Sequence, residues 1–194
     1  KPDRIIYGGE EGLATGIAEY EGRLITILDF EKIVAEISPE TGIQYDDLQR
    51  LGKRSRSNKC ILIAEDSMLL SKMIVESLHR AGYNNTVKTD NGQEAWDYLQ
   101  EVKACGNPID HHVSCIVSDI EMPQMDGHHL TKLVKSDPIL KDVPVILFSS
   151  LINEEMKVKG EQLGANGQIS KPEIASLVSM IDQLTQESKD SAKK

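Results

Sequence analysis

The chain has 194 residues, of which 39% are hydrophobic and only 4% are aromatic, so aliphatic side chains must build any core. Its 31 acidic and 22 basic residues give a formal net charge of −9, which argues against a nucleic-acid partner because phosphate contacts need a positive face. No stretch approaches the roughly 18 consecutive apolar residues of a membrane-spanning helix, so we expect no membrane insertion. Three cysteines without a pairing pattern fit a reducing, cytoplasmic location.

The N-terminal segment, residues 1–37, is predicted to be a small β-rich unit. Leu13–Tyr20 alternates in part and Arg23–Leu28 is rich in β-branched residues, with a two-residue turn signal between them. This pattern predicts a β-hairpin. Asp29 is a helix-capping residue, and the apolar spacing that follows predicts a short helix over Phe30–Ile37.

Residues 38–58 are predicted to be a linker. Ser38-Pro39 ends the preceding helix, and Lys53–Asn58 is small, polar and charged, as linkers are. One or two helical turns could form over Tyr45–Leu51.

Residues 59–186 alternate strand and helix signals five times. The strands are expected at Cys60–Ala64, Thr86–Thr89, Cys115–Val117, Val143–Phe148 and Gly167–Ser170. The helices are expected from the Ser67 cap to Arg80, from Asn91 to Lys103, from about His128 to Ser136, over Asn153–Leu163 and from Pro172 onward, before a polar tail at 187–194. Strict alternation predicts a doubly wound α/β fold, a five-stranded parallel sheet with helices on both faces.

Polar residues stand at the carboxyl ends of these strands, where ligand sites of such sheets lie. They are Glu65, Asp66, Asp119, Ser149 and Lys171. Crowded carboxylates need a cation, and oxygen ligands suit Mg²⁺. The central Asp119 can attack phosphorus as a carboxylate nucleophile, while the metal and Lys171 offset charge on the phosphoryl oxygens. Ser149 can donate a hydrogen bond to the bound phosphoryl group.

The run Asp119–Gly127, DIEMPQMDG, resembles the acceptor motif D-x-x-M-P-x-M-D-G of response-regulator receiver domains, the fold of CheY. Glu65-Asp66 matches the acidic pair of that family, Ser149 its hydroxyl position and Lys171-Pro172 its lysine–proline pair. The resemblance covers about two thirds of the chain and implies the strand order 2-1-3-4-5.

The same resemblance implies a Mg²⁺ site with a defined set of ligands. Asp66 and Asp119 would bind the ion directly, the main-chain carbonyl of Glu121 would be a third protein ligand, and Glu65 would act through water. Asp119 would receive the phosphoryl group from a histidine kinase.

Two positions depart from the family pattern. Receiver domains usually carry Tyr or Phe three residues before the lysine, as a switch coupled to a Thr at the hydroxyl position; this chain has Gln168 and Ser149 there. We expect the phosphorylation chemistry to survive both changes. Without an aromatic residue at this position, the usual rotamer switch is not expected. The alternative is that the effect of phosphorylation passes through the linker or the N-terminal segment.

The run TGIAEYEGRLITILDFEKIV, residues 15–34, resembles the end of a CheW-like adaptor domain. An adaptor followed by a receiver resembles the CheV-type coupling proteins of bacterial chemotaxis, whose partners would be a chemotaxis-type histidine kinase and chemoreceptors bound through the complete adaptor. A partial adaptor would expose apolar faces and strand edges, so we expect residues 1–37 to self-associate or fray. An ordinary β-hairpin module before a receiver is the alternative.

The chain as a whole is compatible with more than one function. A phosphorylatable coupling protein, a switch rather than a metabolic enzyme, accounts for most features. A stand-alone receiver that acts as a phosphate sink is the alternative, and phosphoryl lifetime would separate the two. A haloacid-dehalogenase-like phosphohydrolase would need D-x-D-x-[TV] after its first strand, and a transcription factor would need a DNA-binding segment. The pairs His111-His112 and His128-His129 are predicted to be surface or helix-end residues.

Overall fold

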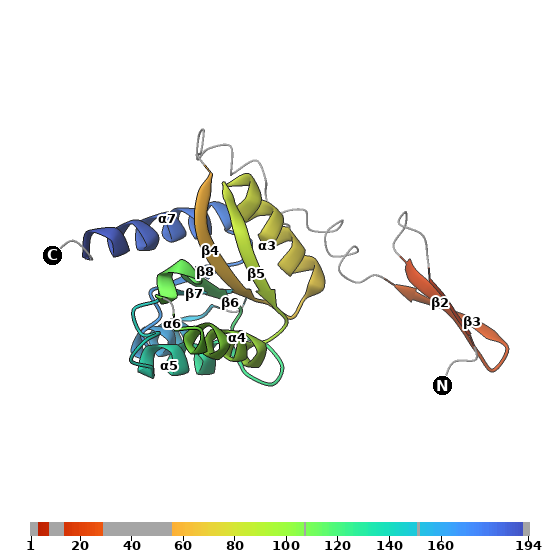
Figure 1. The fold of residues 1–194 in the computed structure, drawn as a ribbon. Coiled ribbons are helices and arrows are strands. Elements are labelled where there is room, and N and C mark those ends of the chain that lie inside the picture. The colour runs from red at the N-terminus through yellow and green to blue at the C-terminus, as the bar shows by residue number, and fades with distance from the viewer. Residues whose placement is uncertain (1–3, 8–13, 29–55, 107, 151, 192–194) are drawn as a thin grey trace. The chain divides into compact units, whose positions relative to one another are not determined.

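The computed structural model describes residues 4–7, 14–28, 56–106, 108–150 and 152–191 (Figure 1). The chain divides into two compact units, residues 1–42 and 43–194. The predicted helix at Phe30–Ile37, the helical turns at Tyr45–Leu51 and most of the predicted linker lie outside the described residues. None of the described helices combines the length and the apolar character needed to cross a membrane.

The N-terminal unit contains a three-stranded antiparallel sheet in the order β1-β2-β3. Its strands are β1 (Arg4–Tyr7), β2 (Ala14–Tyr20) and β3 (Arg23–Leu28). The predicted hairpin is confirmed, whereas β1 was not predicted. Glu21 and Gly22 form the two-residue turn with φ of 49° and 71°, and such turns need positive φ at both positions.

Strand β3 leaves apolar side chains in contact with solvent. Leu24, Ile25 and Ile27 are 72%, 49% and 40% exposed. Successive residues of a strand point to opposite faces of the sheet, so apolar surface is exposed on both faces. The expectation of exposed apolar faces in this unit is therefore confirmed for the described residues.

The second unit is built on a five-stranded parallel sheet in the order β5-β4-β6-β7-β8 (Figure 1). The strands are β4 (Ser57–Ala64), β5 (Tyr83–Thr89), β6 (Cys115–Ser118), β7 (Val145–Ser149) and β8 (Gly167–Ser170). The predicted doubly wound fold and the predicted 2-1-3-4-5 order are both confirmed.

Three strands begin at residues other than the predicted ones, because of pairing between neighbouring strands or because of a proline. β4 and β5 each begin three residues early, because Ser57 pairs with Tyr83 at the edge of the sheet. The hydroxyl of the buried Tyr83 also donates a hydrogen bond to Asp182 Oδ1 at 2.5 Å. β7 begins at Val145 rather than Val143, after a proline that cannot donate to the ladder.

In the described part of this unit, five α-helices connect and cover the strands. They are α3 (Met68–Arg80), α4 (Gly92–Ala104), α5 (Gly127–Ser136), α6 (Glu154–Gln162) and α7 (Ile174–Ser191), with a short 3₁₀ turn, η2, at Ile109–His111. The first four begin after side chains that accept a backbone N–H of the first turn: Ser67, Asn91, Asp126 and Asn153. Helix α7 starts two residues later than predicted and continues through Ser191, into the predicted polar tail.

Two apolar clusters fill the two faces of the sheet. Ile61 and Ile63 of β4 belong to the cluster that includes α3 and α7 residues such as Leu78. Leu62 belongs to the other cluster, with α4 and α5 residues such as Leu99. Because strand side chains alternate between faces, a continuous apolar strand is what a sheet buried on both sides requires. The carboxyl edge of this rigid sheet positions the candidate site.

Candidate functional site

Backbone hydrogen bonds join the loops that follow the strands at the carboxyl edge of the sheet. The N–H of Asp119 donates to Ala64 O at 2.9 Å, which places the loop after β6 against the end of β4. The N–H of Lys171 donates to Ser149 O at 3.1 Å, which does the same for the loops after β8 and β7. The parallel ladders thus bring together side chains that are up to 106 residues apart in the chain.

Three carboxylates form the acidic cluster at this edge, which consists of Glu65, Asp66 and Asp119. Oxygen atoms of all three lie within 4.8 Å of one another. Glu65 is buried, Asp66 is exposed and Asp119 is partly buried, so the cluster runs from the protein interior to solvent. Oxygen-only ligands at a half-open edge fit Mg²⁺, which keeps several of its waters. Glu65 Oε1 is buried and has no hydrogen-bond partner among the described residues, so it could accept from a metal-bound water.

Lys171 links two members of the acidic cluster. Its Nζ lies 2.6 Å from Glu65 Oε2 and 2.8 Å from Asp119 Oδ2. The lysine side chain is 8% exposed, so this ammonium group is shielded from solvent and its position is fixed by both carboxylates. One cation therefore sits where negative charge on a phosphoryl group at Asp119 would need to be offset.

Burial raises the pKa of Glu65, whose side chain is 2% exposed. The ammonium of Lys171 opposes this shift by attraction and by its hydrogen bond, whereas the negative charge of Asp119 adds to it. Desolvation prevails, so a positive charge near this carboxylate would favour its ionised form.

The acceptor loop after β6 is held by a close backbone approach. Asp119 Oδ1 accepts from the N–H of Ile120 at 2.6 Å, and the N–H of Gly127 donates to Ile120 O at 3.0 Å. A Cβ atom at Gly127 would lie 2.0 Å from the carbonyl oxygen of Asp119 and 2.9 Å from Ser118 Oγ. The glycine of the motif thus allows α5 to start directly beside the candidate acceptor.

The structure brings Glu65, Asp66, Asp119 and Lys171 into one cluster, as predicted. Ser149 is buried at the end of β7, level with Ser170 on β8 and therefore next to the lysine. Glu121 is exposed two residues after Asp119, and the role of its carbonyl stays a prediction.

Gln168 lies apart from the acidic cluster and packs against α6. Its Nε2 donates to the carbonyl oxygen of Lys157 at 2.7 Å. This hydrogen bond joins β8 to α6, and Lys171 follows directly after β8. The predicted switch position is therefore occupied by a side chain that is engaged with α6.

His128 lies at a helix start, which is one of the two kinds of position predicted for the paired histidines. It is buried there, with 4% of its area exposed. The sequence feature that indicates this burial is helical spacing, because α5 also buries Thr131 and Val134, three and six residues after His128. His129 is exposed, in line with the prediction.

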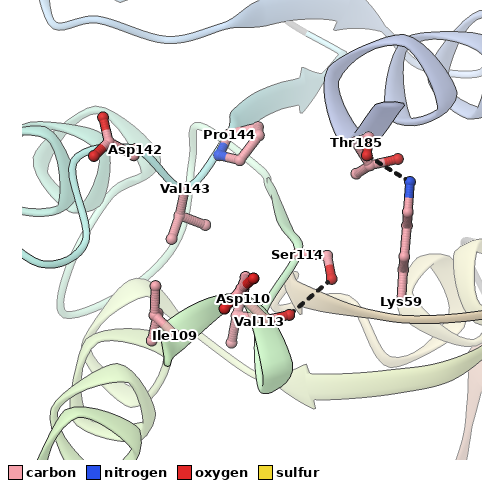
Figure 2. Close-up of a pocket in the computed structure, with 9 residues that line it drawn as sticks. All are labelled: Lys59, Ile109, Asp110, Val113, Ser114, Asp142, Val143, Pro144 and Thr185. Carbon is pink, nitrogen blue, oxygen red and sulfur yellow. Dashed lines mark hydrogen bonds between the residues drawn. The ribbon is translucent and has the colours of Figure 1, made fainter. Parts of the chain in front are cut away.

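A separate pocket of about 320 Å³ opens at the amino-terminal ends of the strands (Figure 2). Lys59 on β4 and Pro144 before β7 line it, and Lys59 Nζ donates to Thr185 O at 2.6 Å. Since this pocket lies at the edge of the sheet opposite to the acidic cluster, it takes no part in the chemistry predicted there.

Comparison with known proteins agrees with this geometry. The response regulator receiver domain family matches residues 61–182. CheV2 of Helicobacter pylori is 30% identical over 89% of this chain and 53% of its own length, and CheV1 of the same organism is 26% identical over 90% and 53%. The chain thus spans about half the length of these curated relatives.

A solved structure extends the likeness to three dimensions. The signal receiver domain of a signal transduction histidine kinase from Syntrophus aciditrophicus is 32% identical, with a TM-score of 0.58 over 66% of this chain and 91% of that one. The chain therefore belongs to the response regulator receiver domain family, and about nine tenths of its length is similar to CheV2 and CheV1 of Helicobacter pylori.

Proposed function

We propose that the chain is a phosphorylation-controlled chemotaxis coupling protein in which Asp119 accepts a phosphoryl group from a chemotaxis-type histidine kinase. The observation that carries the proposal is the position of Lys171, whose ammonium bridges Glu65 and Asp119 beside a third carboxylate, Asp66. A receiver domain with CheV relatives supports chemotaxis as the setting.

In the proposed transfer, a carboxylate oxygen of Asp119 attacks phosphorus and forms a P–O bond. The P–N bond to the kinase histidine breaks, and its electron pair leaves with the imidazole. Hydrogen bonds from the N–H of Ile120 and from Lys171 Nζ fix the orientation of the attacking carboxylate. Asp66, Asp119 and the carbonyl of Glu121 would hold Mg²⁺, with Glu65 behind a water, and the ion would offset charge on the phosphoryl oxygens.

Lys171 and Ser149 would contact the phosphoryl group once it is attached. Both lie at the carboxyl ends of adjacent strands, and the backbone hydrogen bond between them keeps them together. The chemistry is confined to one acceptor and its own hydrolysis, so we infer a signalling switch rather than a metabolic enzyme.

The output would be a change in how the adaptor part engages receptor and kinase. The likeness to CheV2 and CheV1, which continues across most of this chain, supports a link between receiver and adaptor. Gln168 occupies the position of the usual switch aromatic, so we propose that the signal leaves this domain without an aromatic rotamer change.

Phosphoryl uptake from acetyl phosphate tests the proposal. We expect uptake that requires Mg²⁺, is abolished by EDTA and is lost in Asp119→Asn. Asp110→Asn is the matched control, because Asp110 is an exposed carboxylate beside the pocket at the opposite edge of the sheet. Uptake that persists in a folded Asp119→Asn protein would contradict the assignment of the acceptor. A purified chemotaxis-type kinase as phosphodonor then tests the partner, and the decay of the phosphorylated protein separates a signal from a sink.

A further inference from the structure

A pocket of about 560 Å³ lies beside the acidic cluster, between the acceptor loop, the start of α5 and the start of α6. Its lining is strongly acidic: among the described residues it includes one ammonium group, that of Lys159, and four carboxylates, those of Asp66, Glu121, Asp126 and Glu155. Thioethers of Met122 and Met156 supply apolar wall. An anion is therefore disfavoured here, and a cation with an apolar stem is favoured.

His128 gives this pocket a polar group that lacks a partner. The ring is buried, lines the pocket, and its Nε2 makes no hydrogen bond to any described residue. A buried polar nitrogen without a partner costs free energy, so the pocket is built to receive a complementary group.

The unpartnered nitrogen and the carboxylates of the lining indicate which kind of group the pocket fits. A neutral imidazole carries a hydrogen on one ring nitrogen and a lone pair on the other. With the hydrogen on Nδ1, Nε2 of His128 is an acceptor that no described residue uses. The ionised carboxylates of the lining are also acceptors, so the complementary group is a hydrogen-bond donor.

The surroundings of His128 favour the neutral ring that this requires. Burial lowers the pKa of His128, and the nearby ammonium of Lys159 lowers it further, against smaller opposing effects of Asp126 and the Met156 backbone. At neutral pH the imidazole is thus an acceptor inside an acidic pocket.

A guanidinium group satisfies all of these features. It is a cation with five donors in one plane, it is weakly hydrated, and its methylene stem can pack on thioethers. A metal ion does not fit His128, because the metal-capable group among the described residues is Glu65, Asp66 and Asp119, without the histidine. We propose that this pocket binds an arginine side chain of a partner protein, with His128 Nε2 accepting one N–H and pocket carboxylates outside the Mg²⁺ site, such as Glu155, accepting others.

The site can be tested on the full, unphosphorylated chain, so its failure and a failure of the acceptor chemistry are distinguishable. The probe is N-acetyl-arginine amide, and the readout is the ring nitrogen resonances of His128 in a ¹⁵N-labelled sample. We expect a saturable shift of Nε2. The citrulline analogue has nearly the same shape but no charge, and it should bind about tenfold more weakly, the loss expected for one charge-assisted hydrogen bond.

Two variants and one control variant complete the test. His128→Phe fills the ring volume without an acceptor, and it should weaken probe binding about tenfold while Mg²⁺-dependent phosphoryl uptake persists. Glu155→Gln, an exposed change on α6, should weaken binding without altering the core, whereas Glu161→Gln on the same helix but outside the pocket should not. No saturable shift of His128, or binding of the citrulline analogue as tight as that of the arginine probe, would overturn the proposal.

Discussion

The side-chain amide of Gln168 on β8 lies against Gly160 on α6, so a larger residue at position 160 would displace it. A Cβ atom at Gly160 would lie 2.6 Å from Gln168 Oε1. Across this contact the Gln168 amide donates to the Lys157 carbonyl, as described above. Among the residues of α6, all of which are described, Gly160 is the one that is buried, so the helix has little apolar anchoring of its own. The glutamine amide therefore helps to hold α6 on the sheet.

This contact predicts a coupling between substitutions at the two positions. In Gly160→Ala, a gain of about 1 kcal/mol in helix propensity is offset by a comparable loss as Gln168 is displaced from its hydrogen bond, so stability should change little. In a Gln168→Ala background the clash is absent, and the same glycine-to-alanine change should stabilise by about 1 kcal/mol. Urea unfolding of the four proteins measures the coupling energy. Additive effects would show that the side chains do not interact in solution.

The buried carboxylate of Glu65 predicts how stability depends on pH in EDTA. Because its pKa is raised in the folded protein, the folded state keeps this proton to higher pH than the unfolded state does. Its contribution to stability is complete below the ordinary pKa of 4.5 and is lost as pH rises through the folded-state pKa. Glu65→Gln should therefore be more stable than wild type at neutral pH and should flatten the decline above pH 4.5.

Denaturant unfolding across this pH range measures the effect, and Glu161→Gln, an exposed carboxylate on α6, is the control. If Glu65→Gln and wild type lose stability in parallel, the burial of Glu65 does not govern the pH dependence. Added Mg²⁺ should reduce the difference between them, because a nearby cation favours the ionised carboxylate.

The glycine of the acceptor motif predicts a loss of both stability and chemistry. Gly127→Ala would push a methyl group against the Asp119 carbonyl, so we expect a destabilisation of about 1–3 kcal/mol and weaker phosphoryl uptake. Gly106→Ala is the matched control, because φ is +72° there and a Cβ meets nothing described within 4 Å. That variant should lose stability through backbone strain yet retain uptake. Normal uptake by Gly127→Ala would show that the loop tolerates displacement.

The sequence alone was sufficient to locate elements that have a strong local pattern, such as an apolar run or a helix cap. Continuous apolar runs located β4, β6 and β7, since a strand buried on both faces has few polar positions, and the residues just after the first two runs gave the acidic cluster. Side-chain caps located the starts of α3 and α4, because Ser67 and Asn91 accept backbone N–H groups as expected.

The remaining features depend on contacts between distant segments. The start of β5, Tyr83 to Asn85, is polar at two of three positions and becomes a strand through pairing with β4. The contact between Gln168 and Gly160 joins a strand to a helix, and neither residue type indicates it. The burial of His128 follows from packing of α5 on the sheet, against the usual preference of histidine for partly exposed positions.

The N-terminal sheet predicts association of the chain. Leu24, Ile25 and Ile27 expose apolar surface on both faces of β3, and β3 is an edge strand of its sheet. Burial of such surface against a second copy would remove apolar area from water at about 25 cal/mol per Å². We expect the apparent mass in analytical ultracentrifugation to rise with concentration, and Leu24→Asp with Ile27→Asp to suppress the rise. The change Leu69→Asp, at a partly exposed apolar residue of α3, is the control and should leave association intact. A wild-type chain that stays monomeric, with β2 and β3 amides protected from hydrogen exchange, would contradict this expectation, because the sheet would then be stable with its apolar faces in water.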